Sequence, residues 1–69
     1  METIIANVHI GGGNWKTQKI NVYTKEEAKK ILATKKWDVS DDAYIGNKKI
    51  ATGFEYTENN TIVGLYMEV

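Results

Sequence analysis

The 69-residue sequence has no cysteine and only one histidine. Without cysteine it can form neither a disulfide nor a thiolate metal site, and one histidine is too few for the usual zinc ligand sets. A chain this short buries only about 60% of the surface that its unfolded form exposes, and small domains usually need a disulfide, a metal or a partner subunit. We therefore expect no cofactor and no metal ion, with formation of a homodimer as one remaining way to enlarge the core.

Arginine and proline are also absent, and nine lysines balance nine acidic residues to give a formal net charge of zero. A zero net charge removes the general attraction toward nucleic acid and anionic membranes. Arginine is the usual residue for bidentate contacts with guanine and phosphate, so its absence makes nucleic acid the less favoured partner. The bias toward lysine, isoleucine and asparagine suggests an AT-rich genome, as in many low-GC bacteria and their phages.

Long apolar runs are missing as well, since none approaches the roughly 18 residues of a membrane span. The Met-Glu start has neither the basic nor the apolar region of a signal peptide, so we expect a cytoplasmic location without membrane contact. No repeat, linker or low-complexity stretch divides the chain. Residues 1–69 therefore predict a single small α+β domain.

The last third of the chain predicts a β-hairpin around Asn59-Asn60, because asparagine tolerates the positive φ of a two-residue turn. Residues that face each other then share one largely apolar face, since alternate side chains of a strand point the same way. The predicted pairs are Tyr56 with Val63, Phe54 with Leu65, Thr52 with Met67 and Ile50 with Val69. On the opposite face Tyr66 lies across Gly53, an arrangement that shields the backbone of a strand glycine.

Three more strands are expected, at Glu2–Ile10, Lys16–Tyr23 and about Ala43–Gly46. Matching their apolar rows pairs Ile4 with Val22 and Ala6 with Ile20, leaves Gly11–Trp15 as a five-residue loop, and sets Ile45 opposite Ile50 across a turn at Asn47-Lys48.

One helix is predicted between the second and third strands. Thr24 is a good N-cap, and Glu27 three residues later completes a capping box. Ala28, Ile31 and Leu32 form a narrow apolar stripe within a helix of about Lys25–Lys35. The predicted fold is α+β, in the order ββαβββ, with an antiparallel sheet of about five strands and the single helix packed on one face.

Two motifs suggest chemistry, and each fits a simpler role. The Gly11–Asn14 run joins two strands rather than opening a helix, which favours a hairpin loop over a phosphate site. Asp38, Ser40 and Asp42 begin with the spacing of a calcium loop, but the pattern then fails at Ala43 and at its twelfth position. These acidic residues are expected to cap local turns.

Catalytic groups are scarce. His9 lies on the strand face away from the predicted core, and a serine triad would need it to converge with Ser40 and an acid such as Asp38. The sequence does not indicate that convergence, and a domain this small rarely encloses a substrate cavity. We therefore expect that the chain is not an enzyme.

The open face of the predicted sheet is the main candidate for binding. It keeps large residues where a solvated face should be polar, and tyrosine is enriched at interfaces. The five are Ile5, Tyr23, Tyr44, Ile62 and Tyr66. A weaker candidate combines Trp15 of the glycine loop with a basic flank of the helix formed by Lys25, Lys29 and Lys36.

These features predict a non-catalytic protein-binding module, such as a phage or mobile-element accessory or inhibitor protein that acts on a larger host protein. The alternative is a nucleic-acid-binding protein that stacks bases on the tyrosines of the open face and contacts phosphates through the lysine flank. The zero net charge and the missing arginine favour the protein partner, whose identity the sequence does not give.

Overall fold

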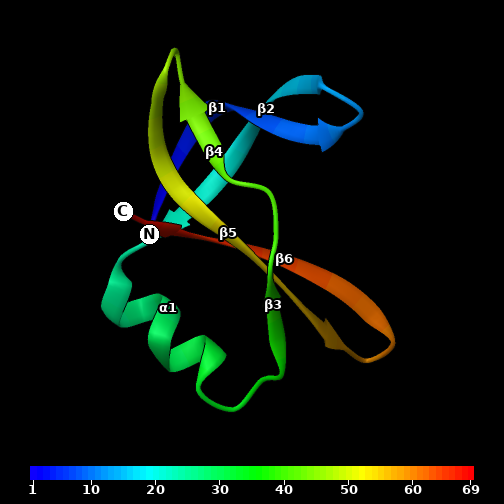
Figure 1. Ribbon diagram of the computed structural model, residues 1–69. Coiled ribbons are helices and arrows are strands. Elements are labelled where there is room, and N and C mark those ends of the chain that lie inside the picture. Colours follow the sequence, from blue (N-terminus) through cyan, green and yellow to red (C-terminus); the bar gives the residue numbers. More distant parts are fainter.

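Six strands and one helix make up the chain, in a computed structural model that describes residues 1–69 (Figure 1). In chain order they are β1 (Glu2–Gly11), β2 (Asn14–Tyr23), α1 (Lys25–Leu32), β3 (Trp37–Val39), β4 (Ala43–Ile45), β5 (Lys48–Glu58) and β6 (Thr61–Glu68). The predicted class, a small α+β domain with one helix, is confirmed. The predicted order lacks β3.

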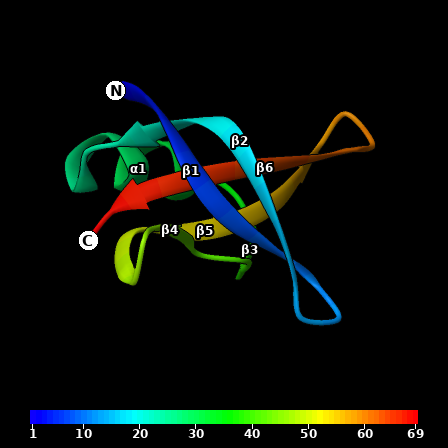
Figure 2. The same cartoon turned by 90° about the horizontal axis from the view of Figure 1, so that it is seen from above.

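Five of the strands close into a small barrel instead of forming an open sheet. Going around it, β1 pairs with β2, β2 with β6, β6 with β5, β5 with β4, and β4 with β1. Val22 and Tyr23 pair in parallel with Tyr66 and Met67, whereas the other pairings are antiparallel. Figure 2 shows the β1–β2 hairpin crossing over the β5–β6 hairpin. The expected all-antiparallel open sheet is therefore wrong.

The register of the β5–β6 hairpin is confirmed over most of its length. Tyr56, Phe54 and Thr52 lie opposite Val63, Leu65 and Met67, and Gly53 lies opposite Tyr66. Asn59 and Asn60 have φ values of 51° and 62°, as a type I′ turn requires. At the far end the observed pairing stops at Ala51 with Glu68, so the expected pair of Ile50 with Val69 does not form.

The registers expected for the other two hairpins are wrong. Ile4 lies opposite Ile20, two residues from the predicted partner. The two-residue turn of Gly12 and Gly13, with φ of 60° and 76°, accounts for one residue of this shift, and the bulge that follows accounts for the other. Ile10 is left as a bulge, and Trp15 belongs to β2 rather than to a loop.

In the β4–β5 hairpin the turn is Gly46-Asn47, so Ile45 faces Lys48 instead of Ile50. Ile50 is an extra residue of β5, because Lys49 and Ala51 pair with the adjacent residues Tyr44 and Ala43. This bulge bends β5 where the barrel curves.

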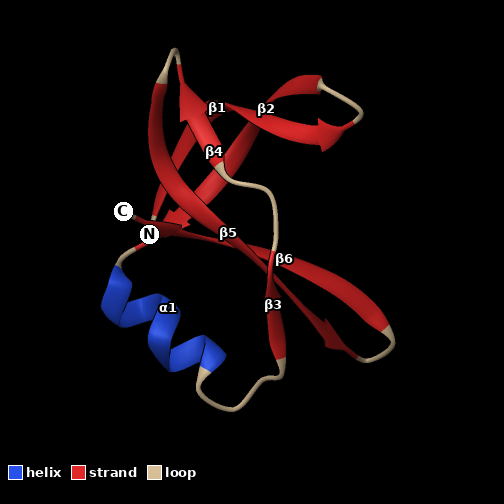
Figure 3. Ribbon diagram, in the orientation of Figure 1, coloured by secondary structure: helices blue, strands red, loops and turns tan.

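Two separate cores lie on the two faces of the β5–β6 hairpin. The barrel interior is filled by small and branched residues, and the helix covers the other face of the hairpin (Figure 3). The buried members of the barrel core are Ala6, Val8, Ile20, Ala43 and Ala51. Those of the helix core are Ala28, Leu32, Phe54 and Leu65. A single short helix covers one face only, and closing the barrel buries the other.

The start of α1 is as predicted, and its end is earlier. The Thr24 hydroxyl accepts the Glu27 N–H and the Glu27 carboxylate accepts the Thr24 N–H, both at 3.1 Å, which completes the capping box. The helix ends at Leu32 rather than Lys35, with Ala33 as C-cap, and the chain then turns into β3. No helix here combines the length and apolar character needed to cross a membrane.

The chain from β3 to β4 runs along one edge of β5. At Gly53 it passes from β3, which lies beside the helix core, to β4, which belongs to the barrel. The Ser40 N–H donates to the Gly53 carbonyl at 2.8 Å, and the Gly53 N–H donates to an Asp42 carboxylate oxygen at 3.2 Å. A Cβ at Gly53 would overlap the carbonyl group of Asp41. Glycine is therefore required here by close backbone approach, and not by solvent exposure of the strand, because Gly53 is buried.

A matched pair of glycine substitutions tests this crossing. Gly53 and Gly64 both lie in the β5–β6 hairpin, neither has a positive φ, and a Cβ at Gly64 would meet open space. Gly53→Ala should lower the free energy of unfolding by at least about 1–3 kcal/mol, the usual effect of overpacking. Gly64→Ala should be neutral or stabilising by up to about 1 kcal/mol. Urea unfolding of the two variants measures the difference, and equal stabilities would contradict the crossing.

Candidate functional site

The five residues predicted to share an open sheet face are distributed over three environments. Ile5 and Tyr44 do lie on the outer surface of β1 and β4, where Ile5 is exposed. Tyr66 instead packs against the barrel core, and Tyr23 packs against the helix core. Ile62 is exposed on the β5–β6 hairpin. The prediction of a single open face is wrong. The face of the β5–β6 hairpin that carries Tyr66 becomes the inside of the barrel, and Tyr23 is covered by the helix.

The predicted lysine flank is also divided. Lys25 and Lys29 are exposed on α1, but Lys36 lies beyond the helix end, just before β3. Lys36 borders a hollow with Asp38 and Glu55, which belong to paired positions of β3 and β5. The three lysines do not form one basic ridge.

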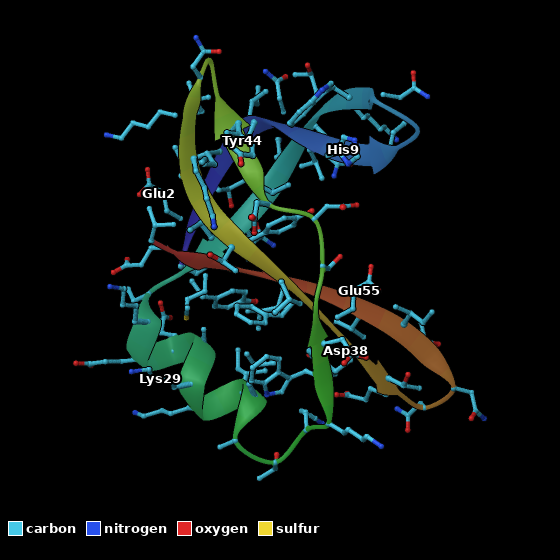
Figure 4. All side chains as sticks on the ribbon, viewed as in Figure 1. Glu2, His9, Lys29, Asp38, Tyr44 and Glu55 are labelled. Carbon is cyan, nitrogen blue, oxygen red and sulfur yellow. The ribbon has the colours of Figure 1, made fainter.

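Trp15 is the centre of an exposed aromatic cluster on the barrel, which we call the Trp15 patch (His9, Trp15 and Tyr44). The Trp15 ring lies 5.2 Å from the His9 ring and 5.5 Å from the Tyr44 ring, centroid to centroid, with edge-to-face geometry in both pairs. Trp15 remains 53% exposed. Figure 4 shows His9 and Tyr44 on β1 and β4, at the end of the molecule away from Lys29.

Strand pairing explains how the patch forms. His9 lies directly opposite Trp15, next to the Ile10 bulge, and Tyr44 lies opposite Asn7 on the other edge of β1. The same outer face is held in register by side-chain hydrogen bonds, from Thr17 to Asn7 at 2.7 Å and from Thr3 to Asn21 at 2.8 Å. The three aromatic side chains are thus carried by three adjacent strands rather than by loops.

Trp15 and Tyr44 line two hollows of different character. One, of about 490 Å³, is completed by uncharged groups of Asn7, Gly46 and Asn47. The other, of about 260 Å³, is bordered by carboxylates, and we call it the Asp41 hollow. Its lining is His9, Trp15, Ser40, Asp41, Asp42 and Tyr44.

The two carboxylates of the Asp41 hollow differ in their partners. Asp42 forms an ion pair with Lys49 at 3.1 Å and accepts the Gly53 N–H. Asp41 has a half-exposed side chain, and its nearest oppositely chargeable group is His9 Nδ1 at 3.8 Å. No lysine lies within 4.0 Å of Asp41, so its carboxylate is the negative charge of the hollow that no ammonium group balances.

The serine–histidine–acid arrangement considered from the sequence comes together only in part. Ser40 and His9 line the same hollow, but Asp38 borders a different one. The Ser40 hydroxyl donates to Glu55 Oε1 at 2.9 Å, so its proton is directed away from the imidazole. The residues of the suggested calcium loop are likewise engaged separately, since Asp42 binds Lys49 and Ser40 binds Glu55.

Two further hollows are more apolar. One of about 480 Å³ lies at a barrel end among Ile4, Val22, Ile45 and Ile50. Another of about 300 Å³ lies between the helix core and Trp37, whose ring packs edge-to-face on Phe54 at 4.8 Å. Neither combines exposed aromatic rings in edge-to-face contact with a carboxylate that no lysine pairs, as the Trp15 patch does.

Sequence reasoning found most of this patch but did not assemble it. His9 and Tyr44 were both expected on the outer face, and Trp15 was a weaker candidate in a loop. A two-residue turn at Gly12-Gly13 alone would pair Gly11 with Asn14 and Ile10 with Trp15. Trp15 lies opposite His9 only because Ile10 is a bulge, so the glycine run carried only part of the signal. Asp41 carried no signal, because its position depends on the crossing at Gly53.

No protein-family model, curated protein or solved structure matches the chain.

Three side chains have displaced pKa values. Burial in the barrel, aided by the charge of Asp41, raises the pKa of the Tyr66 hydroxyl. The hydrogen bond to Glu58, 2.8 Å long, raises the pKa of Lys35. Hydrogen bonds from the terminal amino group and from the Thr24 backbone lower the pKa of Glu27.

The raised pKa of Tyr66 predicts a loss of stability at high pH. The fold favours the neutral hydroxyl, so this contribution is complete below the unfolded-state pKa of about 10 and is lost as pH rises toward and through the higher folded value. Urea unfolding at pH 8 and pH 11 should show a larger loss for the wild type than for Tyr66→Phe. Tyr44→Phe, a control on the outer surface, should retain the wild-type loss. An identical pH dependence in all three proteins would contradict the burial of the Tyr66 hydroxyl.

Proposed function

We propose that the chain is a non-catalytic protein-binding module and that the Trp15 patch is its contact surface. The observation that carries the proposal is the half-exposed Trp15 ring, held between His9 and Tyr44 on paired strands. Tryptophan and tyrosine supply much of the binding energy at protein interfaces, and rigid support lowers the entropy lost on binding. Ile5 is also exposed on β1, four residues before His9, with Asn7 between them on the same face.

The rest of the chain supports a binding role over a catalytic one. Catalytic acids and bases depend on pKa values displaced by burial. The chain buries no polar or charged side chain, and the three displaced pKa values all lie outside the Trp15 patch. Its Ser40 hydroxyl is engaged by Glu55.

The specific form that we propose is an accessory or inhibitor protein of a phage or mobile element, acting in the cytoplasm on a larger host protein. It rests on the small size, the balanced charge and the composition of the chain. Self-association stays a prediction, although the shared open face that first suggested a dimer does not form.

Nucleic acid is the second candidate, because exposed aromatic rings can stack on unpaired bases. The surroundings of the rings disfavour it. Asp41 and Asp42 border the same cluster, and phosphate groups would have to approach these carboxylates. The lysines proposed to hold the phosphates are not gathered beside the rings.

A capture experiment with matched variants tests the proposal. The wild-type chain, Trp15→Ala and Ile62→Ala are used as baits in extracts of the source cells, and captured proteins are then purified for affinity measurement. Ile62→Ala is the control, because Ile62 is exposed and apolar but lies on the other hairpin. The Kd should rise about 30-fold or more in Trp15→Ala, as for an interface hot spot, and stay unchanged in Ile62→Ala.

Two outcomes would overturn the proposal. One is a partner whose Kd is unaffected by Trp15→Ala although the variant is folded. The other is submicromolar binding of an oligonucleotide that weakens steeply with salt, which would assign the surface to nucleic acid.

A further inference from the structure

We infer that the Asp41 hollow is the specificity-determining part of the Trp15 patch and receives one arginine side chain of the protein partner. This inference rests on the proposed function, and it names the chemistry that the partner must present. It depends on three features of the hollow: its charge, its aromatic walls and its size.

The negative charge of the Asp41 carboxylate favours a cation as the group that binds in the hollow. Asp42 is paired with Lys49 at 3.1 Å, whereas the chargeable group within 4.0 Å of the Asp41 carboxylate is the His9 imidazole, at 3.8 Å, and not a lysine. The charged or titratable groups that line the hollow are His9 from β1, Tyr44 from β4, and Asp41 and Asp42 from the β3–β4 connection. No lysine lines it, so an incoming cation meets an unpaired carboxylate.

The aromatic walls favour a flat cation. The Trp15 and Tyr44 rings stand at 86° to each other and both line the hollow, so they form a corner beside the Asp41 carboxylate. A cation over the face of tryptophan or tyrosine is attracted by the ring quadrupole. A guanidinium group can stack on an aromatic face while it donates two hydrogen bonds to a carboxylate, which the compact ammonium group of lysine cannot do.

The size of the hollow fits a single side chain. At about 260 Å³ it is smaller than the roughly 300–1,000 Å³ of sites that enclose drug-sized ligands. Its rim is made of strand residues and of a connection fixed to β5 by the Ser40 and Gly53 hydrogen bonds, so the walls are held before the partner arrives. The chain contains no arginine of its own, so a second copy cannot supply the guanidinium group.

A titration with short peptides tests the inference by NMR. The probes are acetyl-Gly-Arg-Gly-amide and the same peptides with lysine or with citrulline, which keeps the shape of arginine without its charge. The two tryptophans give two indole N–H signals, and Trp37 serves as an internal control because it lies in β3, next to Phe54. The arginine peptide should shift the Trp15 signal with a Kd near the millimolar range and leave the Trp37 signal unchanged.

Matched variants locate the charge that is responsible. Asp41→Asn should weaken binding of the arginine peptide about three- to fivefold, as expected for loss of a partly exposed charge pair. Asp38→Asn removes a carboxylate that borders a different hollow, and it should leave the affinity unchanged. Both substitutions preserve side-chain shape, and unfolding curves verify that the variants are folded.

Three results would overturn the inference: no shift of the Trp15 signal at tens of millimolar peptide, equal shifts with arginine and citrulline, or equal affinity of wild type and Asp41→Asn. A lysine peptide that binds as tightly as the arginine peptide would overturn the assignment to arginine. If these tests fail while Trp15→Ala still abolishes capture of the partner, the protein-binding surface stands and only the arginine site is wrong.

Discussion

The close approach of the Asp41 carbonyl to Gly53 is the contact on which the rest of the structure depends. At this point the chain, still along the same edge of β5, passes from its pairing as β3 to its pairing as β4 in the barrel. The hydrogen bonds of Ser40 and Asp42 to the Gly53 backbone fix the passage on both sides. It delivers β4 to β1, which closes the barrel, brings Tyr44 beside Trp15 and leaves Asp41 beside His9. The absence of a side chain at Gly53 is therefore required both for the fold and for the candidate binding surface.

The chain needs this crossing at Gly53 because it has few residues with which to build a hydrophobic core. One eight-residue helix can cover one face of a two-stranded hairpin, and there is no disulfide to compensate for the face that it leaves open. Pairing β1, β2 and β4 into a barrel with β5 and β6 covers this second face of the hairpin without additional residues. The barrel interior is correspondingly narrow, and Ala6, Ala43 and Ala51 are almost completely buried there. Larger residues at these positions would hold the strands apart.

The sequence predicted local structure, such as turns and the helix cap, but it did not predict that the strands close into a barrel. Turn chemistry at Asn59-Asn60 and the box of Thr24 with Glu27 depend on adjacent residues, and both were predicted correctly. The first hairpin was misaligned by two residues, a shift that leaves every side chain on its original face, so the apolar pattern cannot detect it. Periodicity also shows which face of a strand is apolar but not what covers it. Tyr66 was therefore expected in solvent, although it packs in the barrel. The Trp15 patch was found in pieces, because His9, Trp15 and Tyr44 become neighbours only when β4 reaches β1.

The closed barrel and the surface that it creates can be tested together by nuclear Overhauser effects in solution. The closed barrel predicts cross-peaks between ring protons of Trp15 and Tyr44, whose centroids are 5.5 Å apart, together with backbone contacts from Val8 to Ala43 and from Val22 to Tyr66. These contacts join segments that an open sheet would keep apart. A spectrum that contains the contacts of the β1–β2 and β5–β6 hairpins but none of these three would contradict closure, and with it the assembly of the Trp15 patch.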